Sequence, residues 1–142
     1  MTIREQNEKK KEYLNGYRRM TLKINSLAEQ MRSISEIAES AKAVNYDDMP
    51  HGHKDTDLSD YIVKLENLEE KINAIKKEQY QRRIGIEELI VSMQDGTECD
   101  VLRKRYIECK SWETIAKEIR YSVKQAQRIH GKALIHFELD VK

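Results

Sequence analysis

The stretch "SVKQAQRIHGKALIHF", residues 122–137, has two different faces when it is placed on an α-helix. Lys124, Arg128 and Lys132 follow one another at intervals of four residues and form one cationic ridge. Roughly opposite the ridge lie the apolar residues, Ala126, Ile129, Ala133, Leu134 and Phe137. We therefore expect a helix that packs its apolar face on neighbouring helices and presents its charged face to solvent or to an anionic partner.

The composition of the 142-residue chain favours an all-α protein. It contains one Pro and five Gly, 36% of its residues are charged, and its apolar residues recur at helical spacing. The formal net charge of +1 is unevenly distributed, because residues 97–142 hold ten Lys or Arg against seven Asp or Glu. That leaves +3 in this part of the chain and −2 in the rest, so a cationic surface is expected near the carboxyl end.

Two long segments carry apolar residues in alternating steps of three and four, the spacing of helices that pack in a coiled coil. The first covers about residues 6–44, and the second begins at Leu58. Residues 45–57 between them read as a loop, with Asp57 as the expected N-cap of the second helix. Two such helices joined by a loop predict a long N-terminal antiparallel helical hairpin.

The apolar seam of the second segment is interrupted by Gln79 and Arg82, and Gly85 follows. A Gly inside a helix is less favourable than Ala by about 1 kcal/mol, so we expect a kink or a domain boundary near residue 83. The chain is accordingly divided into a hairpin, residues 1–82, and a carboxyl-terminal domain, residues 83–142.

Three short helices are expected after residue 97, with Thr97, Ser111 and Ser122 as N-caps and Trp112 in the core. Only Arg120 and Tyr121 separate the last two helices, and the small Ala116 lies four residues before this turn. A close crossing of two helices requires a small residue at the contact, so the pattern predicts a helix-turn-helix.

The segment "LRKRYIECKSWETIAKEIRYSVKQAQRIHGKALIHF", residues 102–137, resembles the DNA-binding region four of bacterial sigma factors. The matching positions are Ile115, Ala116, Ser122, Ala126, Ile129, Ala133 and Leu134. With the hairpin in front, the whole chain resembles the ArpU-like regulators of late transcription in phages and prophages of Gram-positive bacteria. Regions of a complete sigma factor that melt promoter DNA or bind the core polymerase are not recognisable.

The resemblance implies that the first turns of a recognition helix, about residues 122–138, meet base edges of double-stranded DNA. The matching positions hold Val123, Lys124, Gln127 and Arg128, whose side chains suit thymine methyl, guanine and adenine edges. Expected phosphate contacts are Arg120, Lys132, Lys110 and Lys117, together with the helix end capped by Ser122.

One departure from the family pattern concerns the turn, where Arg120 and Tyr121 replace the Gly and the small aliphatic residue that the family commonly has. If the turn requires a positive φ, Arg120 must adopt it with some strain.

No motif indicates an enzyme, a cofactor or a metal site. There is no Gly-rich phosphate loop and no Ser/His/Asp set, and His51 and His53 lack further ligands. The amino-terminal stretch has no apolar signal core, and no apolar run approaches the ~20 residues of a membrane span. We therefore expect a cytoplasmic protein without a membrane segment.

These patterns predict a sequence-specific DNA-binding regulator of transcription whose hairpin forms a homodimer or contacts RNA polymerase. Two alternatives remain open. A phage small terminase subunit also joins a helix-turn-helix to a coiled coil and would form a large ring. In a structural coiled-coil protein, the carboxyl-terminal helices would bind protein in place of DNA.

Overall fold

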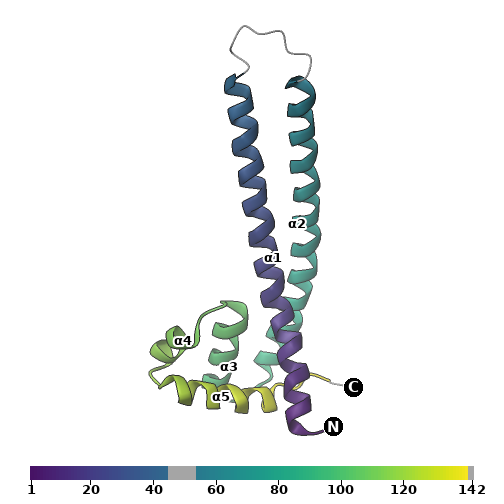
Figure 1. The fold of residues 1–142 in the computed structure, drawn as a ribbon. Coiled ribbons are helices and arrows are strands. Elements are labelled where there is room, and N and C mark those ends of the chain that lie inside the picture. The colour runs from purple at the N-terminus through teal and green to yellow at the C-terminus, as the bar shows by residue number, and fades with distance from the viewer. Residues whose placement is uncertain (45–53, 141–142) are drawn as a thin grey trace. The chain divides into compact units, whose positions relative to one another are not determined.

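The computed structural model describes residues 1–44 and 54–140, and within them every regular element is helical. In chain order the elements are α1 (Ile3–Val44), α2 (Lys54–Val91), α3 (Gly96–Leu102), the π-helical η1 (Arg103–Ile107), α4 (Trp112–Ile119) and α5 (Val123–His136) (Figure 1). The prediction of an all-α protein is confirmed. Among the described helices, none combines the length and the apolar character needed to cross a membrane.

Two local predictions near the loop have different outcomes. The helix α2 begins at Lys54, so the backbone of Asp57 lies inside the helix and not at the predicted N-cap position. The prediction that His51 and His53 belong to a loop lies outside the described residues.

The chain divides into two compact units, and the boundary between them falls within each of the two long helices. One unit comprises Met1–Met20 and Gln79–Lys142, and the other comprises Thr21–Glu78. The amino-terminal part of α1 is therefore grouped with the carboxyl-terminal helices, unlike in the division at residue 82. The helix α2 is continuous through Gly85 to Val91, and the boundary between the two units falls between Glu78 and Gln79, close to the kink or domain boundary expected near residue 83.

Within the unit Thr21–Glu78, the parts of α1 and α2 run in opposite directions (Figure 1). Leu27 of α1 and Ile72 of α2 are buried, while other residues of the predicted seam are half-buried. Large apolar side chains outside the seam are half or more exposed: Leu22, Ile37, Ile62 and Val63. This unit therefore has a narrow apolar seam and keeps further apolar surface in contact with solvent.

Arg82, the polar residue that interrupts the apolar seam, contacts Tyr13 of α1. Its Nη1 donates a 3.0 Å hydrogen bond to the Tyr13 carbonyl, and its guanidinium carbon lies 4.5 Å from the centroid of the Tyr13 ring. A Cβ at Gly85 would lie 2.9 Å from the Tyr13 hydroxyl, so the absence of a side chain there permits the close approach. The polar break in the sequence thus marks a contact between α1 and α2.

One hydrophobic core holds the unit formed by residues 1–20 and 79–142. It combines residues of α1, α2, α3, η1 and α5 with the segment after α5: Leu14, Tyr17, Ile86, Ile90, Leu102, Tyr106, Ala133, Leu134 and Phe137. Burial of a large apolar side chain contributes about 1.5–3 kcal/mol, so this shared core fixes the apolar flank of α5 against several elements.

Lys10 of α1 caps the carboxyl end of α5. Its Nζ donates hydrogen bonds of 2.8 Å to the Leu134 carbonyl and 3.3 Å to the Ile135 carbonyl. The last carbonyls of a helix have no amide partner in a following turn, and a positive charge there also interacts favourably with the helix dipole. The Lys10 side chain is only 6% exposed, and burial lowers the pKa of its ammonium group.

Replacing Lys10 by Met should lower the free energy of unfolding by about 1–3 kcal/mol, because the Leu134 and Ile135 carbonyls lose the Lys10 donor, although the Leu134 carbonyl keeps the 3.3 Å hydrogen bond from the Phe137 amide. Urea denaturation followed by circular dichroism measures the change. The matched control is Lys23→Met, at an exposed position of the same helix. Equal losses in the two variants would contradict a specific role for the Lys10 cap.

Candidate nucleic-acid interface

Side chains at the helix starts fix the positions of α3, α4 and α5. Ser111 Oγ accepts a 3.2 Å hydrogen bond from the Thr114 amide, so the predicted cap of α4 is confirmed. Thr97 was expected to cap α3, but the structure corrects this. Asp95 is the cap, and its Oδ1 accepts from the amides of Thr97 at 2.9 Å and Glu98 at 3.0 Å. Asp is as effective a cap as Ser, and here it precedes the residue that was predicted.

The connection between α4 and α5 is closed by Arg120, which adopts φ 64° and ψ 43° in the left-handed region. Its amide donates to the Lys117 carbonyl at 3.3 Å, and the Tyr121 amide donates to the Ala116 carbonyl at 3.0 Å. This pair of hydrogen bonds is the Schellman termination, which normally uses Gly. The turn therefore does require a positive φ, and a non-glycine residue supplies it.

Ser122 begins α5 with a reciprocal capping box. Its Oγ accepts from the Gln125 amide at 3.1 Å, and Gln125 Oε1 accepts from the Ser122 amide at 3.1 Å. The predicted cap is confirmed. Because both hydrogen bonds are local, the start of α5 is set by its own sequence.

The apolar flank of α5 is buried, whereas the opposite ridge is exposed. Ala126, Ala133 and Leu134 are buried. Exposed residues of α5 include four that were predicted to read bases, Val123, Lys124, Gln127 and Arg128, and the predicted phosphate contact Lys132. The structure thus brings the predicted base-reading residues together on accessible parts of one helix.

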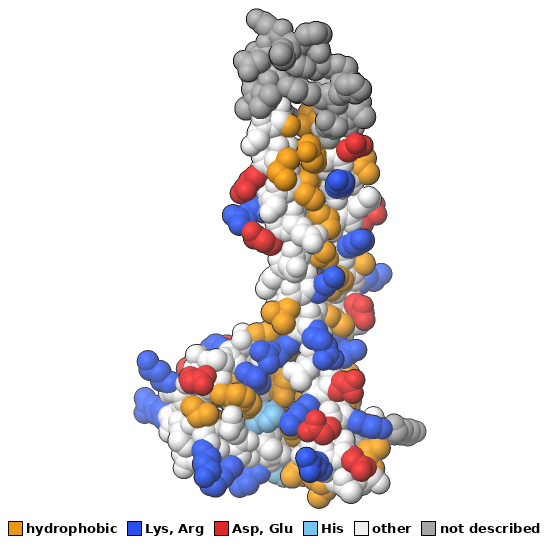
Figure 2. All heavy atoms as spheres, in the orientation of Figure 1, with side chains coloured by type: hydrophobic (Ala, Val, Ile, Leu, Met, Phe, Trp, Pro, Cys, Tyr) orange, Lys and Arg blue, Asp and Glu red, His pale blue; other side chains and the backbone are white. Residues whose placement is uncertain are grey.

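Five basic residues of α4, the turn and α5 define what we call the cationic surface: Lys117, Arg120, Lys124, Arg128 and Lys132. All five are exposed, and within the described residues none of their side chains forms a hydrogen bond or an ion pair. Lys and Arg side chains are visible over the α4 and α5 end of the molecule in Figure 2. Unpaired exposed cations keep their full electrostatic attraction for an anionic partner.

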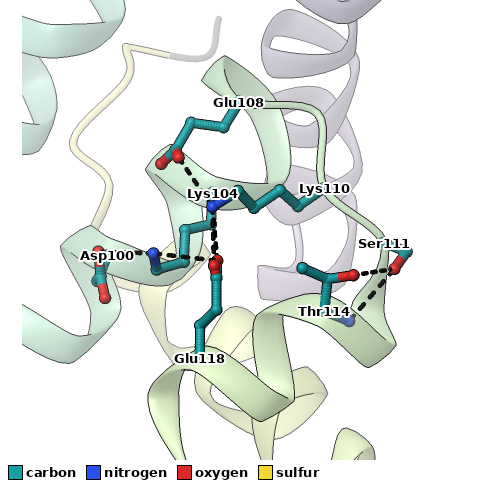
Figure 3. A network of polar contacts seen from close by, with 7 residues as sticks. All are labelled: Asp100, Lys104, Glu108, Lys110, Ser111, Thr114 and Glu118. Carbon is teal, nitrogen blue, oxygen red and sulfur yellow. Dashed lines mark hydrogen bonds and ion pairs between the residues drawn. The ribbon is translucent and has the colours of Figure 1, made fainter.

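Lys110 differs from these five because acidic side chains already surround its ammonium group (Figure 3). Its Nζ lies 2.5 Å and 2.8 Å from the two carboxylate oxygens of Glu118, and 3.1 Å from Glu108. Hydrogen bonds to Glu118 and Glu108 raise the pKa of Lys110, and the Lys110 hydrogen bond lowers the pKa of Glu118. Lys104 lies 3.5 Å from the same Glu118 oxygen. The predicted phosphate contact at Lys110 therefore has less support than those on the cationic surface.

His130 on another flank of α5 is enclosed by two aromatic side chains. Its Nε2 and the Tyr106 hydroxyl share a 2.7 Å hydrogen bond, and its ring lies edge-on to Trp112 with 5.0 Å between the centroids. Burial, reinforced by Lys11 and Arg105, lowers the pKa of His130 to about 4. Burial also raises the pKa of Tyr106 to about 12. Both side chains are therefore neutral near pH 7.

Trp112 was expected in the core, but it is only half-buried. The guanidinium carbon of Arg105 lies 4.7 Å from the centroid of a Trp112 ring, and Arg105 Nη1 donates a 3.1 Å hydrogen bond to the Lys110 carbonyl. Because Trp is large, it is rarely buried completely, and the local sequence does not show which part of the ring stays exposed.

Comparison of the chain with profiles of protein families, with curated proteins and with solved structures finds no match. Among the side chains that the structure describes, no group of three or more His, Cys, Asp or Glu could hold a metal ion.

Arg120→Gly should raise the free energy of unfolding by about 0.5–1 kcal/mol. The reason is that Gly adopts a positive φ without the steric penalty of a side chain, although it gains more entropy in the unfolded chain. Urea denaturation measures the effect, with Lys117→Gly in α4 as the matched control. That control should be destabilised by about 1 kcal/mol, and a similar loss in Arg120→Gly would contradict the strained turn.

Acidification should destabilise the protein through His130. The unfolded histidine binds a proton near pH 6.5, whereas the folded one does so only near pH 4. Between these values the unfolded state binds more protons, so stability falls with falling pH, by up to about 1.4 kcal/mol per unit. In denaturation at a series of pH values, His130→Gln should flatten this dependence relative to wild type. Identical profiles for wild type and His130→Gln would refute the assignment.

Proposed function

We propose that this chain is a sequence-specific DNA-binding regulator of transcription, with α4, the turn and α5 acting as a sigma-like helix-turn-helix. The observation that carries the proposal is the cationic surface, whose five exposed side chains have no intramolecular ion pair in the described residues. Elsewhere in the same compact unit, Lys11, Arg83, Arg103, Lys104 and Lys110 pair with carboxylates. A concentration of unpaired cations on two adjoining helices favours a polyanionic partner.

In the proposed complex, α5 enters the major groove with its ridge toward the bases. The helix has 14 residues, which gives a length of about 21 Å at 1.5 Å per residue, and the groove is about 12 Å wide. Arg128 and Lys124 offer donors to guanine, Gln127 suits adenine, and Val123 suits a thymine methyl. Lys117, Arg120 and Lys132 hold phosphates on either side, which sets the register without reading sequence.

The unit Thr21–Glu78 supplies a protein contact in this proposal, either as a homodimer or toward RNA polymerase. Support comes from the apolar side chains that it leaves at least half exposed: Leu22, Ile37, Ile62 and Val63. Contact with a second apolar surface would remove them from water, and this burial favours association. A symmetric dimer would present two recognition helices to half-sites about one DNA turn apart.

The double variant Lys124→Gln/Arg128→Gln should bind duplex DNA about 10–100 times more weakly than wild type, because it loses two charge-assisted contacts in the groove. Fluorescence anisotropy with labelled duplex at moderate salt measures the affinity. The control Lys64→Gln/Lys71→Gln removes the same charge from exposed positions of α2. Equal binding by both variants and wild type would exclude DNA recognition by α5 and would leave a protein partner for this face.

Selection of bound duplexes from a random pool tests the sequence specificity within the same proposal. Enrichment of a short motif is the expected result, and two copies about one turn apart would indicate a dimer. A pool that stays random would reduce the function to non-specific DNA binding.

A further inference from the structure

A cleft of about 770 Å³ lies beside α5, on the side of its Gln127. One wall is the amino-terminal part of α1, with Arg4 and Lys11, and the other includes Arg105 and Trp112 near the start of α4. All of these residues belong to the single compact unit formed by residues 1–20 and 79–142. The face shown in Figure 2 has Lys and Arg side chains around a histidine in this lower part of the molecule. None of the five residues of the cationic surface lines this cleft.

Basic side chains outnumber acidic ones in the lining of the cleft. Arg4, Lys11 and Arg105 line it, against the single carboxylate of Glu8. Glu8 Oε1 lies 3.1 Å from Lys11 Nζ, so one of the three cations is partly neutralised. Burial and then the charge of Arg18 lower the pKa of Arg105, which shows that a further cation stands close to the lining. Positive charges held close together in this way are stabilised by a bound anion.

The donors around the cleft suit phosphate groups. Arg4 and Arg105 carry guanidinium groups, whose planar arrangement of N–H donors matches two oxygens of a phosphate, and Lys11 supplies a point charge. Gln127 belongs both to the cleft and to the residues proposed to read bases. A duplex seated on α5 would therefore pass the mouth of the cleft with the sugar–phosphate backbone next to the major groove.

We propose that this cleft binds backbone phosphates of the DNA strand that flanks α5, so that the amino-terminal turns of α1 form a second part of the DNA interface. The inference rests on the proposed function and extends it to residues far away in the sequence. Arg4 and Lys11 hold the phosphates from one wall, and Arg105 holds them from the other. Glu8 opposes binding and weakens it through its pairing with Lys11.

The salt dependence of binding tests the role of Arg4 and Lys11. The double variant Arg4→Gln/Lys11→Gln should bind duplex DNA about tenfold more weakly, and the slope of log K against log salt should fall by about 1–2, since each phosphate contact contributes about 0.9. Lys64→Gln/Lys71→Gln is again the charge-matched control and should keep the wild-type slope. If Lys124→Gln/Arg128→Gln weakens binding and Arg4→Gln/Lys11→Gln leaves affinity and slope unchanged, the cleft proposal is overturned and the proposed function stands.

A variant that is expected to bind DNA more tightly provides a second test, because a variant that fails to fold could not show tighter binding. Glu8→Gln removes the one acidic side chain of the lining and releases Lys11, so DNA binding should tighten about two- to fivefold. Glu66→Gln, at an exposed position of α2, is the matched control and should have no such effect. Unchanged binding by Glu8→Gln would also overturn the proposal.

The emission of Trp112, the one tryptophan of the chain, separates DNA from a free phosphate compound as the ligand. Duplex DNA should change this emission in wild type, and the change should be lost in Arg4→Gln/Lys11→Gln. Pyrophosphate is the second probe and should compete only weakly. Saturation by pyrophosphate without competition from duplex would assign the cleft to a free phosphate compound and overturn the DNA assignment. Absence of any binding of duplex by wild type would instead refute the proposed function, and with it this inference.

Discussion

The ammonium group of Lys10, buried against the carboxyl end of α5, fixes the helix on which the proposed DNA contact depends. It occupies the two last-turn carbonyls of Leu134 and Ile135, while the neighbouring Leu134 side chain enters the core beside Leu14. The hydrogen bonds set where the helix ends along its axis, and the core sets its rotation about that axis. At the other end, the Ser122 capping box determines where α5 begins. A helix restrained at both ends and along one flank presents its opposite side with little freedom.

Charge is distributed within this unit according to the role of each cation. Lys104 of η1 and Lys110 of the segment that follows η1 both lie beside Glu118 of α4. These ion pairs lie near the surface, and ion pairs of this kind contribute little to stability. Their larger effect is to leave little net charge between η1 and α4, so that the unpaired cations of the turn and α5 dominate the local field. The cleft also keeps a net positive charge, because its lining has one carboxylate and three basic side chains.

Short-range signals predicted much of the local structure, whereas contacts between distant segments were not accessible to them. Ser111 and Ser122 each act on amides within three residues, so sequence alone identified both caps. Thr97 was misplaced because Asp95, a cap of similar strength, lies just before it. Lys10 lies in a run of three lysines, a pattern that is typical of side chains exposed to solvent. Nothing in the local pattern tells which of the three will meet a helix end more than a hundred residues later.

The topology of the two units has a consequence for how this chain can vary in length. Both termini belong to one compact unit, and residues 21–78 are inserted within it between Met20 and Gln79. A fragment that begins at residue 83 would lack Leu14, Tyr17 and Lys10, and would therefore lose part of its core and the restraint on α5. The inserted part can instead be shortened by removing seven residues from each helix at matching levels, because a whole heptad preserves the facing of the apolar seam. The length of the inserted part is thus adjustable in steps of about 10 Å.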